Sequence, residues 1–480
     1  MVAKMQLRPF SETEIGTIYE KCLEFLSTKG VKVEHQTVPG ILAKAGAQVD
    51  TVDQVVRFPK DIIETALKTV PREILLAGGD SERDARIMSP RDRFFIATAT
   101  GNVNYLDPDS NTYRDVDMAY VTEWARLCEV LDQIDMVFFP FPQDVPLQTA
   151  DVHALKSTLE NTSKHVIVQP YSLESLESLF ELAVVAAGGE KALRKRPLIS
   201  MVSTSLPPFQ FKPMDVEAIV LATRYGVPIY AASLPSIGAT SPATIFGTVL
   251  QNGIEVLASL VMSQLIFPGT PFIGNPVAFT MDMSSGRNVI ASIEAELCQA
   301  ACTQFVKEAY RIPTAPFGFA TDSVVPDGQS MLNRSLLGFL VATAGADILA
   351  EAGHLEAGLV SSPVQLVLDD MLSSMLRRAA AETKVDDDAL AVKEVFETLP
   401  GGHYLDRAHT LRHCRDALRS GLLVNQTRMD WVDAGSKDLS DRAADRYREL
   451  KYDMHPSEMP PEVRKELAII AKNADSRLAR

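Results

Sequence analysis

Cysteine is scarce in this 480-residue chain, which contains five. An odd number of widely spaced cysteines does not suit a disulfide framework, so we expect a reducing, cytoplasmic compartment. Cys298 and Cys302 are one helical turn apart, but no second pair follows nearby in the sequence to complete a metal site, so buried thiols are expected. The other three are Cys22, Cys128 and Cys414.

Positive charge and long apolar runs are also in short supply. Lys and Arg number 47 against 62 Asp and Glu, a formal net charge of -15, which argues against binding to nucleic acid or to an anionic membrane. The first residues, MVAKMQLRPFSETE, lack the apolar core of a signal peptide. No run reaches the roughly eighteen apolar residues of a membrane span, although IEVLASLVMSQLIF comes nearest. We therefore expect a soluble protein without a membrane partner.

Several common site motifs are missing. The chain has no G-x-G-x-x-G or G-x-x-x-x-G-K sequence and no Ser-His-Asp elbow, so nucleotide binding by those loops is not expected. DPDSNTY begins like a calcium loop but lacks its Gly and Glu, which favours a solvated turn. His409 and His413 have the spacing of a zinc pair on a helix, but without an H-E-x-x-H motif a surface pair is preferred. The sequence therefore predicts no metal site.

What the chain does contain is a regular alternation of helices and apolar strands. Hydrophobic residues make up 46%, enough for a large core. From residue 116 onward, seven helix-then-strand units follow one another, and each strand is a continuous apolar run, as in parallel strands buried on both faces. With residues 93–98 as the eighth strand, the simplest closure is an α/β fold of the (β/α)8 TIM barrel type. An open doubly wound sheet is the alternative, but it would need an early Gly-rich phosphate turn.

Three regions are expected along the chain. Residues 1–90 contain short helices and strands, beginning with a helix capped by Ser11 and Glu14 and stopped by Gly30, and predict a small α/β cap. Residues 91–362 form the barrel. Residues 363–480 read as helices, which we expect to pack on the outside of the barrel.

The candidate site residues follow from the barrel, because chemistry in this fold lies at the carboxyl ends of the strands. GADILAEAGH and TAPFGFATDS each lead from an apolar run into a polar loop, which makes Asp322, Glu351 and His354 candidate catalytic residues. Aromatic rings at strand ends suit a quaternary ammonium ion, although layer-filling core is the alternative for any single ring. The expected substrate-binding residues are Phe94, Asn104, Tyr105, Phe139, Gln169, Tyr171, Tyr230, Asn275, Phe317, Phe319 and His354.

The chain resembles the trimethylamine methyltransferase family in several long segments. These are GATSPATIFGTVLQNGIEVLASLVMSQLIFPGTPFIGN, MDMSSGRN, RIPTAPFGFATDSVVPDGQ, AGADILAEAGHLEAGLVSSPVQLVLDD and PGGHYLDRAHTLRHCR. The resemblance implies a barrel that moves a methyl group from a methylated amine to the cobalt of a separate small corrinoid protein, with no tightly bound cofactor of its own. The resemblance is also compatible with a homo-oligomer.

The founding members of that family place pyrrolysine at the barrel mouth, whereas this chain contains only standard residues. A quaternary ammonium ion needs no activation of its nitrogen, because a neutral tertiary amine leaves when the methyl group is attacked. The resemblance therefore implies a non-pyrrolysine enzyme acting on glycine betaine, with proline betaine, carnitine or choline as alternatives. A barrel that binds the cation without turnover, and a metal-dependent lyase or hydrolase, are the other hypotheses. Donors for a betaine carboxylate would be His354, Asn275, Asn104, Gln169 and Arg287.

Overall fold

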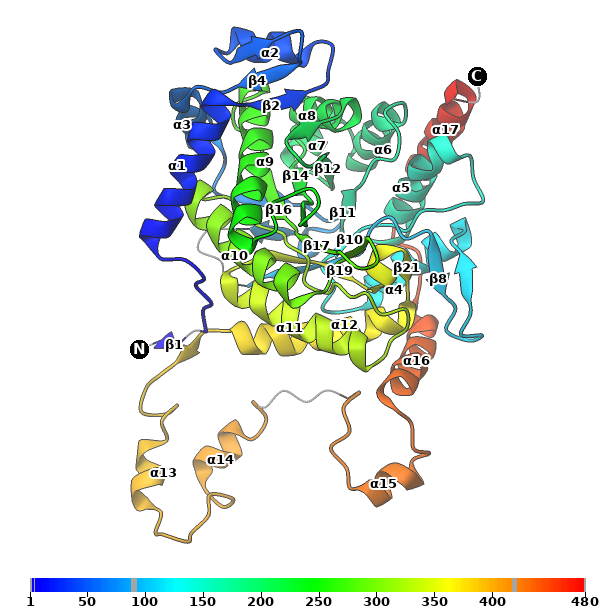
Figure 1. Ribbon diagram of the computed structural model, residues 1–480. Coiled ribbons are helices and arrows are strands. Elements are labelled where there is room, and N and C mark those ends of the chain that lie inside the picture. The colour runs from blue at the N-terminus through cyan, green and yellow to red at the C-terminus, as the bar shows by residue number, and fades with distance from the viewer. Residues whose placement is uncertain (1, 4, 88–92, 417–420, 479–480) are drawn as a thin grey trace.

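The computed structural model describes residues 2–3, 5–87, 93–416 and 421–478, and its centre is a closed parallel barrel (Figure 1). Seven strands are hydrogen-bonded side by side in the order β16-β14-β12-β11-β10-β7-β19, and every neighbouring pair is parallel. The predicted α/β barrel is confirmed. The strands are β7 (Phe95–Thr98), β10 (Met136–Val137), β11 (His165–Val168), β12 (Ile199–Ser205), β14 (Ile229–Ser233), β16 (Phe272–Pro276) and β19 (Ile348–Ala352).

The eighth position of the barrel is filled by the irregular segment 313–317, which lies between β16 and β19. Single bridges join Thr314 to Gly274 and Phe317 to Ala350, both parallel. Two of its five residues are prolines, which have no N–H to donate, so a regular ladder cannot form. We call this segment and its two neighbours the seam of the barrel.

Helices alternate with the strands around the outside, as the sequence pattern predicted. Several begin at a side chain that accepts a backbone N–H, for example Asp117, Thr244, Ser292 and Asp327. The surrounding helices are α4 (Met118–Val130), α5 (Ala150–Asn161), α6 (Leu176–Ala187), α7 (Glu190–Lys195), α8 (Pro213–Tyr225), α9 (Ile245–Ile266), α10 (Ile293–Tyr310), α11 (Gly328–Ala344) and α12 (Pro363–Ala380).

Helix α9 is long and apolar enough to cross a membrane by length and composition alone, and it contains the most apolar run of the sequence. In the structure 78% of its apolar window is buried inside the protein. The helix packs against β12, β14 and β16 on one side and against α1, α3 and α10 on the other. Its apolar character therefore matches its position between the barrel and an outer helix layer.

The N-terminal region forms a small α/β unit beside α9 and α10. Ser11 and Glu14 make the predicted capping box at the start of α1, and Gly30, with φ +77°, follows the end of that helix. Its four-stranded sheet has the order β13-β2-β4-β3, and one of these strands, β13, belongs to the loop that follows barrel strand β12. The elements are α1 (Glu12–Thr28), β2 (Val31–Val33), α2 (Val38–Lys44), β3 (Gln48–Asp50), β4 (Val55–Arg57), α3 (Lys60–Thr69), β5 (Ile74–Leu76), β6 (Ala85–Ile87) and β13 (Gln210–Phe211).

The C-terminal region differs from the expectation that its helices all pack on the barrel. Helices α16 (Leu439–Leu450) and α17 (Pro461–Leu478) do pack, against α12 and against α5 and α6 respectively. Helices α13 (Val392–Glu397), α14 (Ala408–His413) and α15 (Arg428–Asp433) contain no buried residue and lie apart from the barrel (Figure 1). The physical reason is that each has only six residues, too few to present a continuous apolar face.

Short strands form two small sheets beyond the barrel strands. One has the order β15-β17-β18 and the other β20-β21-β8-β9, and both grow from loops that follow barrel strands. Separately from these two sheets, β1 (Val2–Ala3) near the N-terminus pairs antiparallel with β22 (Thr383–Lys384). The bounds of the mouth strands are β8 (Asn104–Leu106), β9 (Tyr113–Asp115), β15 (Ser236–Ile237), β17 (Phe279–Asp282), β18 (Arg287–Val289), β20 (His354–Leu355) and β21 (Val360–Ser361).

The proposed limits at residues 90 and 362 stay predictions. The first lies in a stretch outside the described residues, and the second falls at the N-cap of α12.

Candidate functional site

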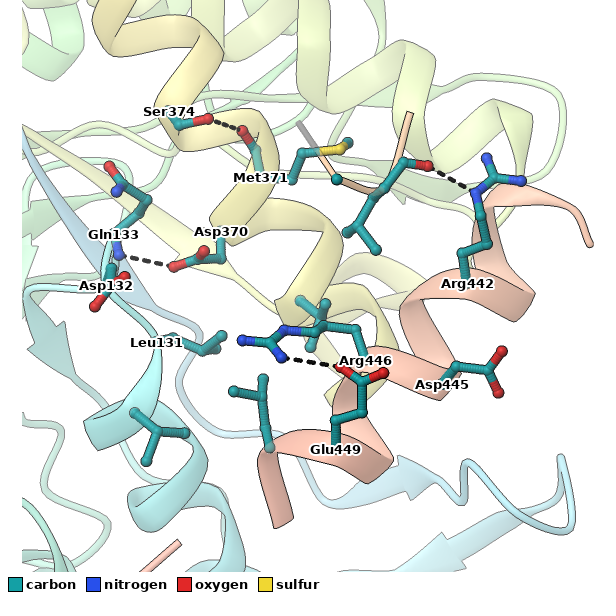
Figure 2. Close-up of a pocket in the computed structure, with 15 residues that line it drawn as sticks. Leu131, Asp132, Gln133, Asp370, Met371, Ser374, Arg442, Asp445, Arg446 and Glu449 are labelled. Carbon is teal, nitrogen blue, oxygen red and sulfur yellow. Dashed lines mark hydrogen bonds and ion pairs between the residues drawn. The ribbon is translucent and has the colours of Figure 1, made fainter. Parts of the chain in front are cut away.

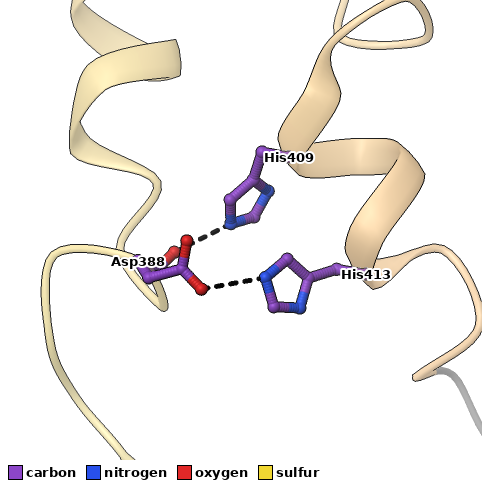
Figure 3. A group of neighbouring side chains, drawn as sticks. All are labelled: Asp388, His409 and His413. Atoms are coloured by element: carbon purple, nitrogen blue, oxygen red, sulfur yellow. Dashed lines mark hydrogen bonds and ion pairs between the residues drawn. The ribbon is translucent and has the colours of Figure 1, made fainter.

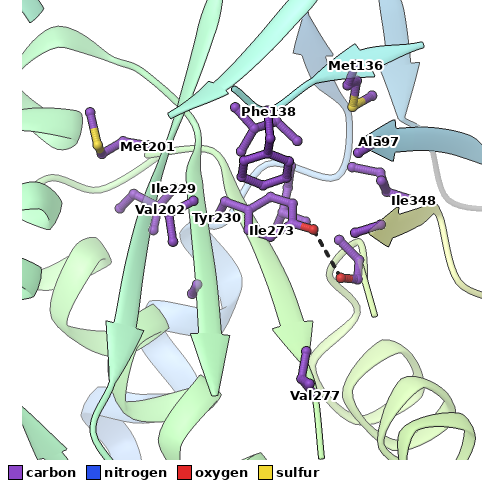
Figure 4. Close-up of a cluster of buried hydrophobic side chains, with 14 of the residues drawn as sticks. Ala97, Met136, Phe138, Met201, Val202, Ile229, Tyr230, Ile273, Val277 and Ile348 are labelled. Carbon is purple, nitrogen blue, oxygen red and sulfur yellow. Dashed lines mark hydrogen bonds between the residues drawn. The ribbon is translucent and has the colours of Figure 1, made fainter. Parts of the chain in front are cut away.

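The interior of the barrel is filled by large side chains, which form a floor beneath its mouth (Figure 4). Register places Val202, Tyr230 and Ile273 side by side on three adjacent strands. The ring of Tyr230 meets that of Phe138 edge to face with centroids 5.8 Å apart. Its hydroxyl donates to the carbonyl oxygen of Ala315, two strand positions away, at 3.2 Å. Tyr230 was predicted to bind substrate, but this geometry makes it a buried floor residue.

One layer closer to the mouth the side chains become small and polar. Register pairs Thr204 with Ala232 and Ala232 with Asn275. Because side chains alternate along a strand, these three face the same side as the floor residues two positions earlier. Asn275 is 5% exposed, and its Oδ1 is buried without a hydrogen-bond partner among the described residues. The layer above the floor therefore has small and mostly polar side chains, and one of its buried hydrogen-bonding groups has no partner.

Three more unpartnered polar atoms lie in loops that follow barrel strands. They are Thr100 Oγ1, Asn102 Oδ1 and the Tyr171 hydroxyl, all buried and without a well-formed hydrogen bond within the described part of the chain. Tyr171 lies beside Thr100, and burial, followed by the charge of Asp151, raises the pKa of the phenol. Buried polar groups normally have partners, so unpaired ones at one end of a barrel indicate a place for water or a polar ligand.

Aromatic rings gather in the same loops. Tyr171 meets Phe141 edge to face with centroids 4.6 Å apart, and Phe139 at 6.4 Å. Phe317, at the end of the seam segment, meets Phe279 at 6.3 Å. Phe139, Tyr171 and Phe317 are among the predicted substrate-binding residues, whereas Phe141 and Phe279, the first residue of β17, are not. Two aromatic groups therefore stand at different strand ends of the mouth.

Glu351 and His354 form a buried pair where β19 ends. His354 is fully buried, and its Nδ1 lies 2.9 Å from Glu351 Oε2. The N–H of Thr321 donates to His354 Nε2 at 3.3 Å, so Nδ1 carries the proton and donates to the carboxylate. Both ring nitrogens are thus engaged, and the geometry does not support His354 as a free donor for a substrate carboxylate.

Glu351 has the left-handed backbone conformation, with φ +77°, which is strained for a residue with a side chain. Burial, and after it the charge of Glu351, raise the pKa of Tyr230, which places the carboxylate near the floor of the mouth. Among the three candidate catalytic residues, Glu351 alone combines a left-handed backbone conformation with an effect on a floor residue.

A buried arginine holds the loop that carries His354. Arg334 of α11 is fully buried and pairs with Asp369 Oδ2 at 2.8 Å. A second guanidinium N–H donates to the main-chain oxygen of His354, and Asp369 Oδ2 also accepts the N–H of Gly353 at 2.7 Å. Burial lowers the pKa of Arg334, while Asp369 opposes that shift. The pair clamps the turn between β19 and β20.

Asp322 lies at the mouth but is occupied by the main chain. Its two oxygens accept the N–H groups of Ile290 at 3.1 Å and Ala291 at 3.0 Å, just before α10. This geometry favours a positioning role for Asp322 over direct chemistry.

The remaining predicted residues fall into different places. Asn104 donates to Asp115 at 2.9 Å, and Tyr105 stacks on Tyr120 with centroids 3.9 Å apart, so both are held within the β8 hairpin region. Gln169 follows β11 directly and is half-buried. Phe319 is fully buried beyond the seam segment.

The prediction for Phe94 is wrong. Phe94 precedes β7, so it lies at the amino end of the barrel, where Arg377 of α12 approaches its ring at 5.9 Å. The error arose because the strand begins one residue later than its aromatic run, and the carboxyl end of β7 is Thr98.

Sequence reasoning missed two buried carboxylates that hold strand ends. Glu255 of α9 accepts from Ser205 at 2.7 Å and from Ser233 at 2.8 Å, and burial raises its pKa. Asp215 accepts the N–H of Thr204 at 2.8 Å, and burial raises its pKa to about 6. Glu255 lies within one of the family-like segments and Asp215 in none of them, and in both cases the signal for this role was a carboxylate on the apolar face of a helix.

A separate cavity of about 530 Å³ lies between α12, α16 and the loop after α4 (Figure 2). Gln133 donates its N–H to Asp370 at 2.7 Å on one wall, and Arg446 pairs with Glu449 at 2.9 Å on the other. Gln133 precedes β10, so this cavity adjoins the amino ends of the strands. In barrels of this kind that end usually serves stability, so we do not assign it the chemistry.

Comparison with known proteins agrees with this geometry. The family model for trimethylamine methyltransferase (MTTB) matches residues 2–476. A trimethylamine methyltransferase MttB of Desulfitobacterium hafniense is 31% identical over 470 residues, covering 98% of this chain and 94% of that protein. A glycine betaine methyltransferase from the same species is 24% identical, with 94% of each covered.

Among solved structures, the monomethylamine methyltransferase MtmB of Methanosarcina barkeri has a TM-score of 0.57 at 12% identity, covering 94% of this chain and 90% of that one. A hydroxylamine complex of MtmB has a TM-score of 0.58. These two structures support the fold, and the match to the family model over nearly the whole chain supports the family. The chain belongs to the trimethylamine methyltransferase family and is a methyltransferase.

Proposed function

We propose that the protein transfers a methyl group from a quaternary amine, glycine betaine first, to the Co(I) centre of a separate corrinoid protein. The observation that carries the proposal is the layer above the barrel floor, where Oδ1 of Asn275 is buried without a hydrogen-bond partner among the described residues. The ring groups of Tyr171 and Phe317 stand at other strand ends of the same mouth. Membership of the family supplies the reaction class.

Aromatic faces suit this substrate better than close carboxylates. A quaternary ammonium ion cannot donate hydrogen bonds, and the faces of aromatic rings attract it electrostatically. Its charge disappears as the methyl group leaves, so an enzyme that bound the charge too strongly would oppose its own reaction. The two ring groups provide attraction, and Glu351 supplies one carboxylate that is already shared with His354.

Asn275 is the best-placed donor for a carboxylate. A side-chain amide can present either its oxygen or its N–H2 group after a rotation, so the buried, unpartnered end of Asn275 can face an anion. This substitutes for His354, whose two nitrogens are engaged.

The chemical step is an in-line displacement. Co(I) supplies an electron pair to the methyl carbon, the C–N bond breaks toward nitrogen, and a neutral tertiary amine leaves. The residues of the barrel need only orient the methyl group and exclude water, without a general acid. The half-buried Gln169, Thr204 and Phe279 leave the carboxyl end of the barrel reachable, which an acceptor on another protein requires.

The test is a substrate panel with added cob(I)alamin as acceptor. Glycine betaine, proline betaine, carnitine, choline and trimethylamine are each mixed with the protein, and both the loss of cob(I)alamin absorbance and the demethylated amine are measured. We expect turnover with betaine, yielding dimethylglycine. Binding of betaine without turnover, repeated with a corrinoid protein as acceptor, would instead favour the non-catalytic barrel.

The ring groups are tested by paired substitutions at Tyr171. Tyr171→Phe keeps the ring and should retain most affinity for the cation, whereas Tyr171→Leu removes it and should raise KM by tenfold or more. Equal effects from both variants would contradict the aromatic binding of the ammonium group.

A further inference from the structure

The described residues of the segment 385–435, which are 385–416 and 421–435, have almost no core of their own. Its three short helices contain no buried residue, and large apolar side chains such as Phe396 and Leu405 are each 86% exposed. A segment of this kind cannot be stabilised by hydrophobic burial alone, and small units without a core are commonly held by a bound metal. Side chains that can bind a metal are present within it.

Two histidines and an aspartate meet at one point of this segment (Figure 3). His409 and His413 project from the same face of α14, and Asp388 lies on the preceding loop, 21 residues before His409. One potential ligand atom from each of the three residues lies within 4.8 Å of the others. The sequence offered only the histidine pair, and folding brings the third ligand.

We propose that Asp388, His409 and His413 bind one divalent transition-metal ion, with zinc the best match. Imidazole nitrogens and a carboxylate are ligands that zinc prefers, and three protein ligands leave a fourth position for water on this exposed surface. In a tetrahedral site with bonds of roughly 2.0 Å, ligand atoms lie about 3.3 Å apart. His413 Nε2 and Asp388 Oδ2 are already 3.1 Å apart.

The surrounding contacts orient these ligands as a metal site requires. Asp416 Oδ2 lies 2.6 Å from His413 Nδ1, an arrangement that fixes the ring and turns Nε2 toward the cluster. Arg412 donates to Asp388 Oδ1 at 2.8 Å, which leaves Oδ2 facing His413. His409 Nε2 lies 2.8 Å from the main-chain oxygen of Asp388, so its N–H donates to the same loop, and a bound ion would replace that hydrogen bond.

A bound ion would join α14 to the acidic loop at 386–388 and so close a loop of the otherwise coreless segment. Metal ligation can supply the folding free energy that such a segment lacks. The inference concerns this segment alone and does not depend on which amine is the substrate.

The experiment uses the full chain, stripped of metal and titrated with zinc against a chromogenic chelator. We expect one zinc per chain, with affinity lowered at least a hundredfold in His409→Gln and in His413→Gln. Asp416→Asn, which touches only the second nitrogen of His413, should weaken binding by roughly tenfold. His403→Gln is the matched control, because His403 lies in the same segment outside the cluster, and it should bind like the wild type.

Two further readouts make the result decisive. Cobalt(II) in place of zinc should give the intense visible absorption of a four-coordinate site in the wild type and lose it in His413→Gln. Limited proteolysis should cut within 385–435 faster after metal removal, while the thermal unfolding of the barrel stays unchanged. The proposal is overturned if the wild type binds zinc no more tightly than His409→Gln does. It is also overturned if His403→Gln loses as much zinc affinity as the variants of the cluster.

Discussion

At the scale of single residues, the substrate proposal depends most on Asn275. Its amide sits above the barrel floor with one buried end unpaired. Asn275→Ala should raise KM for glycine betaine by at least tenfold but leave KM for choline, which has no carboxylate, within a factor of two if choline is turned over. A matched control is Asn104→Ala, since Asn104 is already bonded to Asp115 in a hairpin. Equal losses for both amines would remove Asn275 as the carboxylate donor.

Arg334 is the residue whose loss should most disturb the mouth without touching substrate. Arg334→Met leaves the buried Asp369 charge without its partner, which typically costs about 3 to 5 kcal/mol. Thermal or urea unfolding should show this loss, and KM should rise because the His354 turn is released. The double variant Arg334→Met, Asp369→Leu removes both charges and should recover part of the stability. An unchanged unfolding midpoint in the single variant would contradict the clamp.

Glu296 of α10 should make stability depend on pH. It is 1% exposed with Oε2 unpartnered, and burial raises its pKa from 4.5 to about 7. Between these values the folded state holds a proton that the unfolded state releases, so stability falls as pH rises from about 4.5 to 7. At 1.36 kcal/mol per pKa unit, the full loss is roughly 3 kcal/mol above pH 7.

Glu296→Gln removes that titration. We expect it to be more stable than the wild type at pH 8 and about equal at pH 4, measured by urea unfolding at both values. A difference that does not change with pH would mean that Glu296 is ionised in the folded protein.

At the scale of elements, α9 does more than cover the barrel. Its Glu255 joins the ends of β12 and β14 through Ser205 and Ser233, and it also accepts the N–H of Phe209 at 3.0 Å. These strand ends carry the Thr204 and Ala232 part of the mouth layer. The helix therefore fixes the spacing of the layer that we assign to substrate.

Glu255→Ala should lower stability by about 2 kcal/mol, because buried donors lose their acceptor. Glu255→Gln keeps one acceptor oxygen and should lose less. Melting temperature and KM should change together in Glu255→Ala. Glu294→Ala, an exposed glutamate on the neighbouring helix, should change neither, and a similar loss there would show that the effect is not specific to the strand ends.

The elements show what the sequence could and could not predict. Helix and strand alternation predicted the barrel because apolar period and length are local properties. The seam segment was predicted as an ordinary strand, although its prolines limit it to single bridges. His354 and Glu351 were found from a strand end, but the clamp by Arg334 and Asp369 was not, since those partners are far apart in the sequence. Asp388 was missed as a ligand for the same reason.

At the scale of the whole molecule, the barrel is closed but not uniform. Toward β16 the segment 313–317 has two backbone hydrogen bonds, from Gly274 N–H to Pro313 and from Ala315 N–H to Gly274. Toward β19, segment 313–319 has five, so the weak side of the seam is the side that faces β16. The ladder between β12 and β14 is continuous over five residue pairs. Separating the segment from β16 should therefore need less free energy than opening that ladder.

Hydrogen exchange should reveal this difference. The amides of Gly274 and Ala315 should exchange at least tenfold faster than those of the central residues of β12 and β14, measured by mass spectrometry or NMR at a pH where the fold is intact. If the seam amides and the amides of the β12–β14 ladder were equally protected from exchange, burial rather than the hydrogen-bond ladder would control opening of the barrel.

The filled interior has a further consequence for the order of events. Because Tyr230, Phe138 and their neighbours fill the barrel from below, the mouth layer is closed from the amino ends of the described strands, which leaves their carboxyl ends as the side of entry. On the proposed function, the amine and the methyl acceptor must share that entrance, with the amine beneath. The amine then has to enter first and the acceptor protein has to depart before product escapes, so turnover follows a compulsory sequence that an excess of acceptor would slow.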